Sequence, residues 1–166
     1  GSDDIDSFTK SSGIDCEPTS NGDQFLDETI GFSVYSVSSS SGNKTLSYVK
    51  NIDGIAGDEL TLVLFGKQLT AYSTSTYVKV SLKIDNQEKM VRYFNKTNTD
   101  ILFDCITLGF SAKEAFSKVE ILITLVGTVS IKLGGVKLLM KKLGSFYNYD
   151  ESSNVSDIIY GVTSTN

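Results

Sequence analysis

The segment from Thr76 to Ile84 has the cleanest alternation of apolar and polar residues in the chain, and this alternation constrains the fold more than any other feature. A period of two is the spacing at which successive side chains of a β-strand point to opposite faces of a sheet. The segment therefore predicts a strand with one face on an apolar core and the other toward water, as is typical of antiparallel sheets. The apolar positions are Val78, Val80, Leu82 and Ile84, and the positions between them are Tyr77, Lys79, Ser81 and Lys83.

Similar strand signals recur along the chain, separated by short segments rich in Gly, Ser, Asn and Asp. Only residues 111–116 contain helix formers, and we expect at most one turn of helix there. Short strands at this spacing predict an all-β fold, an antiparallel β-sandwich of jelly-roll type. We expect strands at residues 32–37, 45–49, 59–65, 76–84, 89–94, 101–108, 117–125, 128–133 and 136–140, and a hairpin loop at 85–88. The expected core contains Leu60, Leu62, Leu64, Val78, Val80, Leu82, Ile84, Val119, Ile121, Ile123, Val129, Ile131, Val136 and Leu138.

The composition indicates one folded domain with an acidic surface. A chain of 166 residues is long enough for one core and too short to argue for two. The formal charge is −5, and the basic residues form no cluster beyond Lys141 and Lys142, which argues against nucleic acid as a partner. No apolar run approaches the roughly 20 residues that span a bilayer. We therefore expect no membrane insertion, and a monomer when the domain is isolated.

The absence of histidine excludes Ser-His-Asp and Cys-His nucleophile systems and removes the commonest ligand of transition metals. A glycosidase would need two acidic groups in a cleft, one of them with a raised pKa. Asp100, Asp104, Glu114 and Glu120 fall in loops or on solvated strand faces, and nothing marks two of them as a pair. We therefore expect a chain that is not an enzyme, with no catalytic residue and no side-chain metal site.

Two further residue types have ordinary structural interpretations. Cys16 and Cys105 form no CxxC motif, and the sequence leaves open whether they pair as a disulfide or remain free thiols. Cys105 lies among strand residues and is expected to be a small core side chain. Asp53, Asp58 and Asp85 lie in turns, where Asp commonly caps backbone N–H groups, so we expect capping there rather than an ion site.

Three stretches together resemble a known family. The first is Ile55-Ala-Gly-Asp-Glu-Leu-Thr-Leu62, the second is the strand pair formed by residues 117–125 and 129–138, and the third is Phe146-Tyr-Asn-Tyr-Asp-Glu-Ser-Ser-Asn-Val155. From about Asn51 onward, their order is similar to the galactose-binding-like jelly roll of carbohydrate-binding modules. The form in question stands next to tyrosine–aspartate (YD, or RHS) repeats in wall-associated proteins of Gram-positive bacteria. The third stretch resembles the start of such a repeat.

Together with the Ser-, Asp-, Gly- and Thr-rich composition of residues 3–23, this resemblance implies a division of the chain and a function. Residues 1–24 would be an irregular lead-in with a tag remnant at Gly1-Ser2, residues 25–144 the β-sandwich binding module, and residues 145–166 the start of a YD-like repeat or a linker. The module would bind cell-wall or other glycan within a larger bacterial surface or secreted protein, and so would be extracellular or associated with the cell wall. The alternative is a structural spacer or adhesin domain that binds another surface protein or no ligand.

The chain also departs from the family pattern. Relatives often carry an acidic or Asn pair before the last strand that supports a structural calcium ion, and this chain has Gly134 and Gly135 there. Glycine offers only backbone carbonyls as ligands. We therefore expect no cofactor, with a weakened calcium site as the alternative. The usual tryptophan before a later core strand is replaced by Leu102-Phe103.

Sugar-binding modules present aromatic faces to pyranose rings and surround them with polar side chains. The strand at 76–84 and its neighbour predict such a surface, with Tyr72 and Tyr48 extending it from nearby turn regions. The same positions are also those that a half-buried sheet simply turns to solvent. The ligand-binding residues predicted on this basis are Tyr77, Lys79, Arg92, Phe94 and Tyr72.

Overall fold

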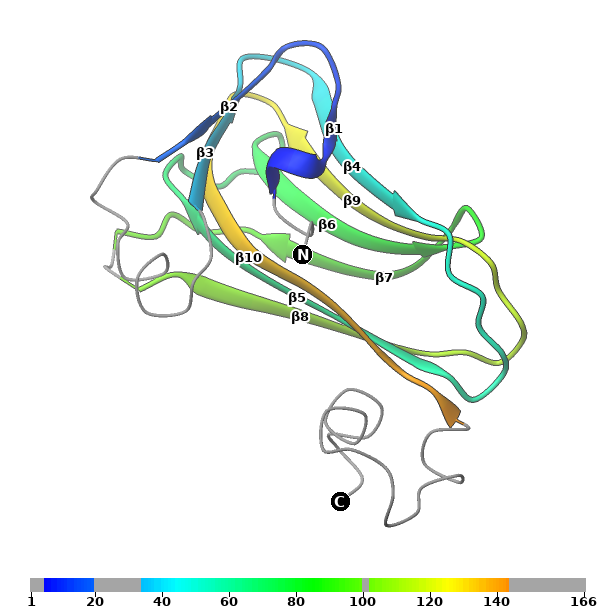
Figure 1. The fold of residues 1–166 in the computed structure, drawn as a ribbon. Helices are drawn as coiled ribbons and strands as arrows, with labels where there is room; N and C mark the ends of the chain where they lie inside the picture. The colour runs from blue at the N-terminus through cyan, green and yellow to red at the C-terminus, as the bar shows by residue number, and fades with distance from the viewer. Residues whose placement is uncertain (1–4, 20–33, 100–101, 144–166) are drawn as a thin grey trace.

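The computed structural model describes residues 5–19, 34–99 and 102–143. Two five-stranded sheets pack face to face, and every strand pairing is antiparallel (Figure 1). Sheet A contains, in spatial order, β1 (Thr9–Lys10), β4 (Asn43–Lys50), β9 (Val119–Val126), β6 (Tyr77–Ile84) and β7 (Gln87–Phe94). Sheet B contains β2 (Ile14–Pro18), β3 (Val34–Ser39), β10 (Val129–Lys141), β5 (Glu59–Gln68) and β8 (Asp104–Ser111). The predicted fold class, an all-β antiparallel sandwich, is confirmed.

The predicted strands correspond to β3 through β10 within the described residues, with two differences in detail. The hairpin between β6 and β7 is tighter than expected, because Asp85 and Asn86 alone form the turn, with φ of 48° and 67°. The two strands predicted at 128–133 and 136–140 are one strand, β10. A register shift between Gly134 and Lys137 interrupts its pairing with β5, and Gly135 has φ of 63°, a conformation that favours glycine.

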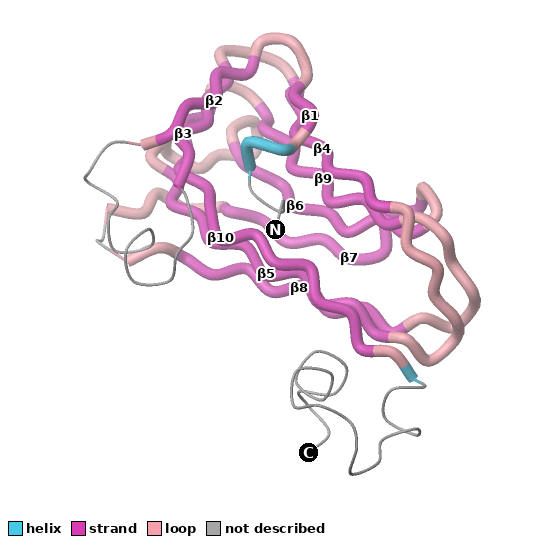
Figure 2. The backbone as a smooth tube through the Cα atoms, viewed as in Figure 1, coloured by secondary structure: helices cyan, strands magenta, loops and turns pink. Residues whose placement is uncertain are grey.

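The lead-in is more ordered than its polar composition predicts. A short 3-10 helix, η1 (Ile5–Ser7), places Ile5 and Phe8 in the core, and the Phe8 ring lies 5.4 Å from that of Tyr48. Strand β1 then joins β4, and β2 joins β3, so this segment adds an edge strand to each sheet. Figure 2 shows how it crosses from one sheet to the other. The YD-like segment at 145–166 lies outside the described residues, and its boundary stays a prediction.

The core lies between the sheets and is formed by the apolar positions that alternate along each strand. Of the predicted core residues, all but Leu138 are buried, and Leu138 is half-buried and packs against the core. Cys16 lies on β2 and Cys105 on β8, at opposite edges of sheet B, and both are free thiols. Cys105 is exposed, so the prediction that it belongs to the core is wrong. Within the described part of the chain, no helix is long and apolar enough to cross a membrane.

A glycine on β5 makes room for an aromatic ring from the other sheet. A Cβ atom added to Gly66 would lie 2.4 Å from the Phe94 ring, which is a closer approach than packed atoms allow. Phe94 is the last residue of β7 and is buried between the sheets. The absence of a side chain at position 66 therefore allows β7 to anchor against sheet B.

Gly66→Ala is expected to lower the free energy of unfolding by about 1–3 kcal/mol, because the methyl group overlaps the Phe94 ring. Gly109→Ala on β8 is the matched control, since a Cβ there would meet nothing within 4 Å. The control should change stability by less than about 0.5 kcal/mol or raise it. Urea denaturation measures the free energy of unfolding of both variants. Equal effects of the two substitutions would show that the Phe94 ring does not require a glycine at position 66.

A buried carboxylate joins the end of β10 to the turn before β5. Asp58 is 0% exposed, and its oxygens accept hydrogen bonds from Ile55 N at 3.0 Å and Leu143 N at 2.8 Å. Lys142 Nζ lies 3.4 Å from the same carboxylate. Burial alone would raise the pKa of Asp58, but the two backbone donors and Lys142 outweigh it and lower the pKa below its ordinary value. This confirms the predicted capping role of Asp58.

Asp58→Asn should lower the free energy of unfolding at pH 7 by about 1–3 kcal/mol, because it removes the charge that these donors stabilise. A lowered pKa means that the carboxylate stabilises the fold above its ordinary pKa of about 4 and loses that effect as the pH falls through the lower value. The difference in the free energy of unfolding between wild type and variant, measured by urea denaturation, should therefore be smaller at about pH 2.5 than at pH 7. Asp53→Asn, at an exposed position of the same loop, is the control. If the difference in stability is the same at low pH, the negative charge of Asp58 is not what stabilises the fold.

Candidate functional site

The outer face of sheet A carries the polar positions of four neighbouring strands. The alternation on β6 turns Tyr77, Lys79, Ser81 and Lys83 away from the core, as predicted, while Val78, Val80, Leu82 and Ile84 point inward. The register of the neighbouring strands then determines which side chains surround them. Thr45 and Ser47 on β4, Glu120, Leu122 and Thr124 on β9, and Glu88, Val91 and Tyr93 on β7 share this face.

This outer face carries paired charges along it. Lys79 bonds Glu88 at 3.0 Å, and Lys83 lies 3.5 Å from Glu120, whose side chain is only 15% exposed. Ser47 Oγ also donates to Glu120, at 2.5 Å. Ser81, between the two lysines, is 1% exposed. Ser81 points outward in the alternation of β6, and the larger side chains around it cover it almost completely.

Three tyrosines line a pocket at one end of this face. Tyr72, Tyr77 and Tyr93 form it together with Thr74 and Asn95, and its volume is about 300 Å³. The rings of Tyr77 and Tyr93 meet edge to face, with centroids 5.8 Å apart and planes at 65°. Tyr72 and Tyr93 are 48% and 50% exposed, so their rings are available to a ligand.

A tight turn brings Tyr72 to this pocket. Ser73 and Thr76 exchange backbone hydrogen bonds of 3.0 and 3.2 Å, so the residues just outside them, Tyr72 and Tyr77, are brought opposite each other. The turn is held by close contact with Gly127, in the connection between β9 and β10. A Cβ there would lie 2.4 Å from Ser75 O, and Gly127 has φ of 80°. The position of Tyr72 therefore depends on a contact between distant parts of the chain.

The structure separates two predicted ligand residues from the others. Strand β7 pairs Phe94 with Val78 and Arg92 with Val80, whereas Tyr93 pairs with Lys79. Phe94 is only 4% exposed, so its ring belongs to the core and cannot stack on a ligand at the surface. The cause is a β-bulge: the register shifts by one residue between Leu82 and Lys83, and a shift of one exchanges the two faces of a strand. Tyr93 thus occupies the place predicted for Phe94.

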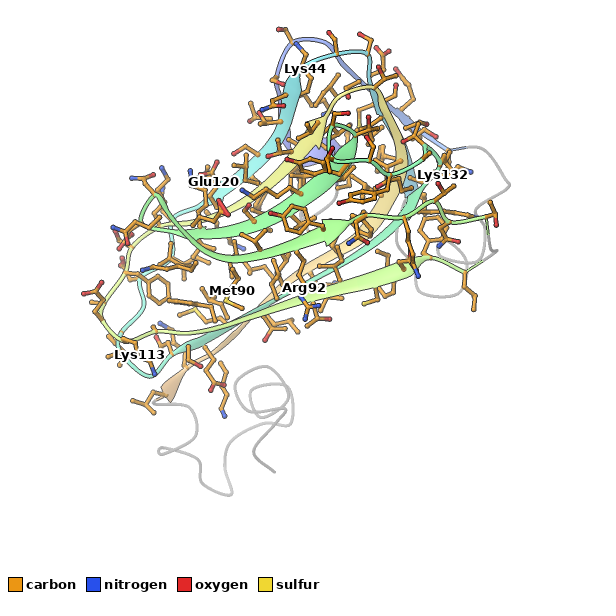
Figure 3. The ribbon with its side chains drawn as sticks, turned by 180° about the vertical axis from the view of Figure 1, so that it is seen from behind. Lys44, Met90, Arg92, Lys113, Glu120 and Lys132 are labelled. Atoms are coloured by element: carbon orange, nitrogen blue, oxygen red, sulfur yellow. The ribbon has the colours of Figure 1, made fainter. Side chains whose placement is uncertain are left out.

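Arg92 is exposed and lies at a different site from Tyr77 and Lys79. It lines a pocket of about 360 Å³ between the edge strands β7 and β8, with Lys96, Asp104 and Thr107 among the other residues of its wall. Figure 3, the view from behind, shows Arg92 between these two strands. Tyr48 is also absent from the predicted surface, because it pairs with the inward-facing Ile121 and packs on the core.

No group of three or more His, Cys, Asp or Glu side chains within the described residues could hold a metal ion. Asp85, like Asp58, serves as a backbone cap, and its Oδ1 accepts from Ser117 N and Lys118 N at 3.0 Å each. Gly134 and Gly135 lie in the bulge of β10 and are buried. A calcium site there stays a prediction.

No family model and no curated protein matches this chain. Among solved structures, its fold is similar to a Family 16 Carbohydrate Binding Module-2, with a TM-score of 0.53 and 13% identity, over 82% of this chain and 92% of the other. The fold is also similar to a CBM22-1-GH10 segment of Clostridium thermocellum xylanase 10B, solved with xylohexaose. The TM-score is 0.52 and the sequence identity 14%, over 81% of this chain and 26% of the other. A cyclase from Fischerella sp. TAU has a TM-score of 0.52 and 13% sequence identity, over 66% of this chain and 64% of the other. At such identities the likeness concerns the fold alone.

Adjacent residues of β7 test this register. Phe94→Ala should lower the free energy of unfolding by about 3–5 kcal/mol, because it empties a core position. Tyr93→Ala removes an exposed ring of similar size and should cost less than about 1 kcal/mol. Urea denaturation followed by circular dichroism measures both. If Tyr93→Ala lowers the free energy of unfolding more than Phe94→Ala does, the bulge is absent and Phe94 lies on the outer face, as the sequence predicts.

Proposed function

We propose that this chain is a non-catalytic carbohydrate-binding module that holds a glycan on the outer face of sheet A. The observation that carries the proposal is the convergence of Tyr72, Tyr77 and Tyr93 on one surface pocket at one end of this face. Aromatic rings offer the apolar C–H faces of sugars a matching surface, and nearby side chains can bond their hydroxyls. Asn95 and Thr74 provide such polar groups in the pocket itself, and Lys79 is adjacent to Tyr93 across the strands.

Binding fits this site better than catalysis does. A glycosidase needs a carboxylic acid whose pKa is raised so that it can donate a proton. Asp58, a fully buried carboxyl, has a lowered pKa and already accepts from two backbone N–H groups. The tyrosine pocket itself contains no carboxylate among its lining residues.

A single shallow site of this kind would bind weakly and gain retention from multiple copies or neighbouring modules. That property suits a module within a larger protein, as the YD-like residues 146–155 suggest by resemblance. We therefore place the chain in a secreted or surface-attached bacterial protein, with cell-wall or other polysaccharide as its partner. The competing function is that of a spacer or adhesin domain. An adhesin would bind another protein through a cluster of exposed apolar side chains. Those with the largest exposure, Ile55 and Leu102, lie in separate loops.

The test is binding of the domain to a panel of soluble and insoluble polysaccharides, including bacterial wall preparations. Tyr72→Ala with Tyr77→Ala should reduce affinity for the bound glycan at least tenfold, because stacking rings dominate such sites. Tyr72→Phe retains the ring and should bind within a few-fold of wild type. The chain has eight tyrosines and no tryptophan, so tyrosine fluorescence can follow binding directly.

Leu139→Ala is the control, because Leu139 is exposed on the outer face of sheet B. It should bind glycan as wild type does. Binding that survives the double tyrosine substitution would place the site elsewhere on the domain. No binding to any polysaccharide would overturn the proposal and favour the spacer or adhesin function.

A further inference from the structure

Arg92 is a charged residue at a position of β7 that faces the other sheet. Register places it opposite the buried Val80, and its neighbours on the same face of β7 are Met90 and Phe94. Because β7 is an edge strand of sheet A and β8 an edge strand of sheet B, this face opens to water between them, and Arg92 is exposed there (Figure 3). Of the 15 Lys and Arg residues in the chain, Arg92 is the only arginine. The one guanidinium group thus lies in the opening between the two sheets.

The pocket at this opening contains two cations that the fold does not neutralise. Arg92 and Lys96 both line it, and in the described part of the chain neither side chain forms an ion pair or a hydrogen bond. Lys79 and Lys83, on the outer face of sheet A, are by contrast paired with glutamates. Asp104 is the only acidic side chain among the described lining residues, and it pairs with neither cation. Two positive charges therefore stand against one negative charge in this pocket.

The chemistry of this wall suits an anionic group. A guanidinium group presents two parallel N–H donors to two oxygens of a carboxylate or phosphate, an arrangement that a lysine ammonium group cannot reproduce. Lys96 supplies a second positive charge, and Asn95 and Thr107 supply neutral polar groups. The pocket volume of about 360 Å³ is within the range of small-molecule sites. The pocket can therefore hold one charged sugar or a group of similar size.

This pocket shares a wall with the tyrosine pocket, because Tyr93 and Asn95 line both. Arg92 and Tyr93 are consecutive residues of β7, so their side chains point to opposite faces of the strand. Since β7 is an edge strand, no further strand of sheet A separates the two pockets on its free side. A ligand whose sugar ring stacks on Tyr93 can thus extend around the edge of the sheet to Arg92.

We infer that the pocket between β7 and β8 binds the carboxylate or phosphate group of an acidic glycan, with Arg92 as a bidentate donor and Lys96 as a second cation. This inference rests on the proposed function and names its ligand class: a sugar chain with an anionic group next to the sugar that the tyrosines hold. The net charge of −5 opposes such a ligand only at long range. At about 0.15 M salt, exposed charges more than about 8 Å away are largely screened, so the local cations decide.

Arg92 also has a structural explanation, because a charge that points inward on an edge strand prevents strands of two molecules from pairing. The two explanations differ in what they require of position 92. Edge protection requires a positive charge, which lysine also carries, whereas bidentate binding requires the guanidinium group. Substitution by lysine therefore separates them.

Arg92→Lys should lower affinity for an acidic glycan about threefold to tenfold, and Arg92→Gln more than tenfold, because the first loses the bidentate contact and the second also loses the charge. Both variants should keep the melting temperature of wild type, since Arg92 forms no bond within the described fold. Lys50→Gln removes an exposed charge from β4, which β9 and β6 separate from β7, and should bind as wild type does. If Arg92→Lys binds as tightly as wild type and Arg92→Gln self-associates in size-exclusion chromatography, Arg92 protects the edge and the inference is wrong.

Asp104→Asn should have the opposite effect. It removes the negative charge that repels an anionic ligand, so affinity for the acidic glycan should rise about twofold to fivefold. A gain of this kind cannot arise from damage to the fold. Weaker binding of the acidic glycan by Asp104→Asn would show that the carboxylate itself contacts the ligand, and would contradict an anion site.

The ligand class is tested with polygalacturonate for the carboxylate, polyglycerol phosphate for the phosphate, and methyl-esterified polygalacturonate as an uncharged counterpart. Wild type should bind at least one acidic polymer tenfold or more tightly than the esterified polymer and the neutral polysaccharides. That affinity should fall between about 50 mM and 500 mM salt, because the contact is electrostatic. The acidic polymer that binds identifies the anionic group. Binding to neither acidic polymer, or equal binding of the esterified one, would overturn the inference.

The two free thiols provide a test of location. Cys105 is exposed and lines the pocket, whereas Cys16 lies at the opposite edge of sheet B, where burial raises the pKa of its thiol. A saturating acidic glycan should slow alkylation of Cys105 by iodoacetamide at least threefold and leave the slower reaction of Cys16 unchanged. Peptide mass spectrometry measures both rates. An unchanged rate at Cys105 would place the anionic group elsewhere and overturn the inference.

The two proposals can fail separately. If the double substitution of Tyr72 and Tyr77 abolishes glycan binding but Arg92→Gln binds as tightly as wild type, the module function stands and the anion site is refuted. If the domain binds neutral polysaccharides alone, the result is the same. If no polysaccharide binds, both proposals are refuted.

Discussion

The apolar contact between the inner faces of the two sheets determines which side chains remain on the outer faces. Along β6 and β9 every second residue is buried in this contact, including Leu82 and Ile123. Because a strand turns alternate side chains to opposite faces, each residue committed to the core leaves its neighbours on the outside. The outer face of sheet A is thus the complement of the core.

This alternation explains why the core residues could be predicted from the sequence, whereas the residues of the candidate site could be predicted only in part. The alternation on β6 is a local pattern, and it correctly assigned Val78 to the core and Lys79 to the surface. The pairing of β7 with β6 depends on one extra residue near the hairpin, and that bulge exchanges Tyr93 and Phe94 between the two faces. What stabilises the observed register is the fit of the Phe94 ring over Gly66, on a strand of the other sheet. No local pattern carries that information.

The remaining omissions also arise from contacts between distant segments. Ser47 and Glu120 share the outer face of sheet A with Lys83 because β4, β9 and β6 are neighbours in space, an order that strand signals alone do not specify. Tyr72 reaches its pocket through a turn supported by Gly127. The lead-in was predicted as irregular because β1 has only two residues, too few for a visible alternation, yet Ile5 and Phe8 complete the core. A short polar segment can therefore be structural when two apolar residues anchor it.

The structural neighbours bear on the same distinction between core and surface. Sugar-binding modules and a cyclase share this fold with the chain at 13–14% identity, so the sandwich alone does not determine what such a domain binds or whether it reacts. Function has to be argued from the outer positions. Here a pocket of tyrosines assembled by a turn lies at one end of a face whose charged pairs are set by strand register. Lys79 and Tyr93 pair across β6 and β7, so the tyrosine pocket and the charged pairs of the sheet belong to one continuous surface.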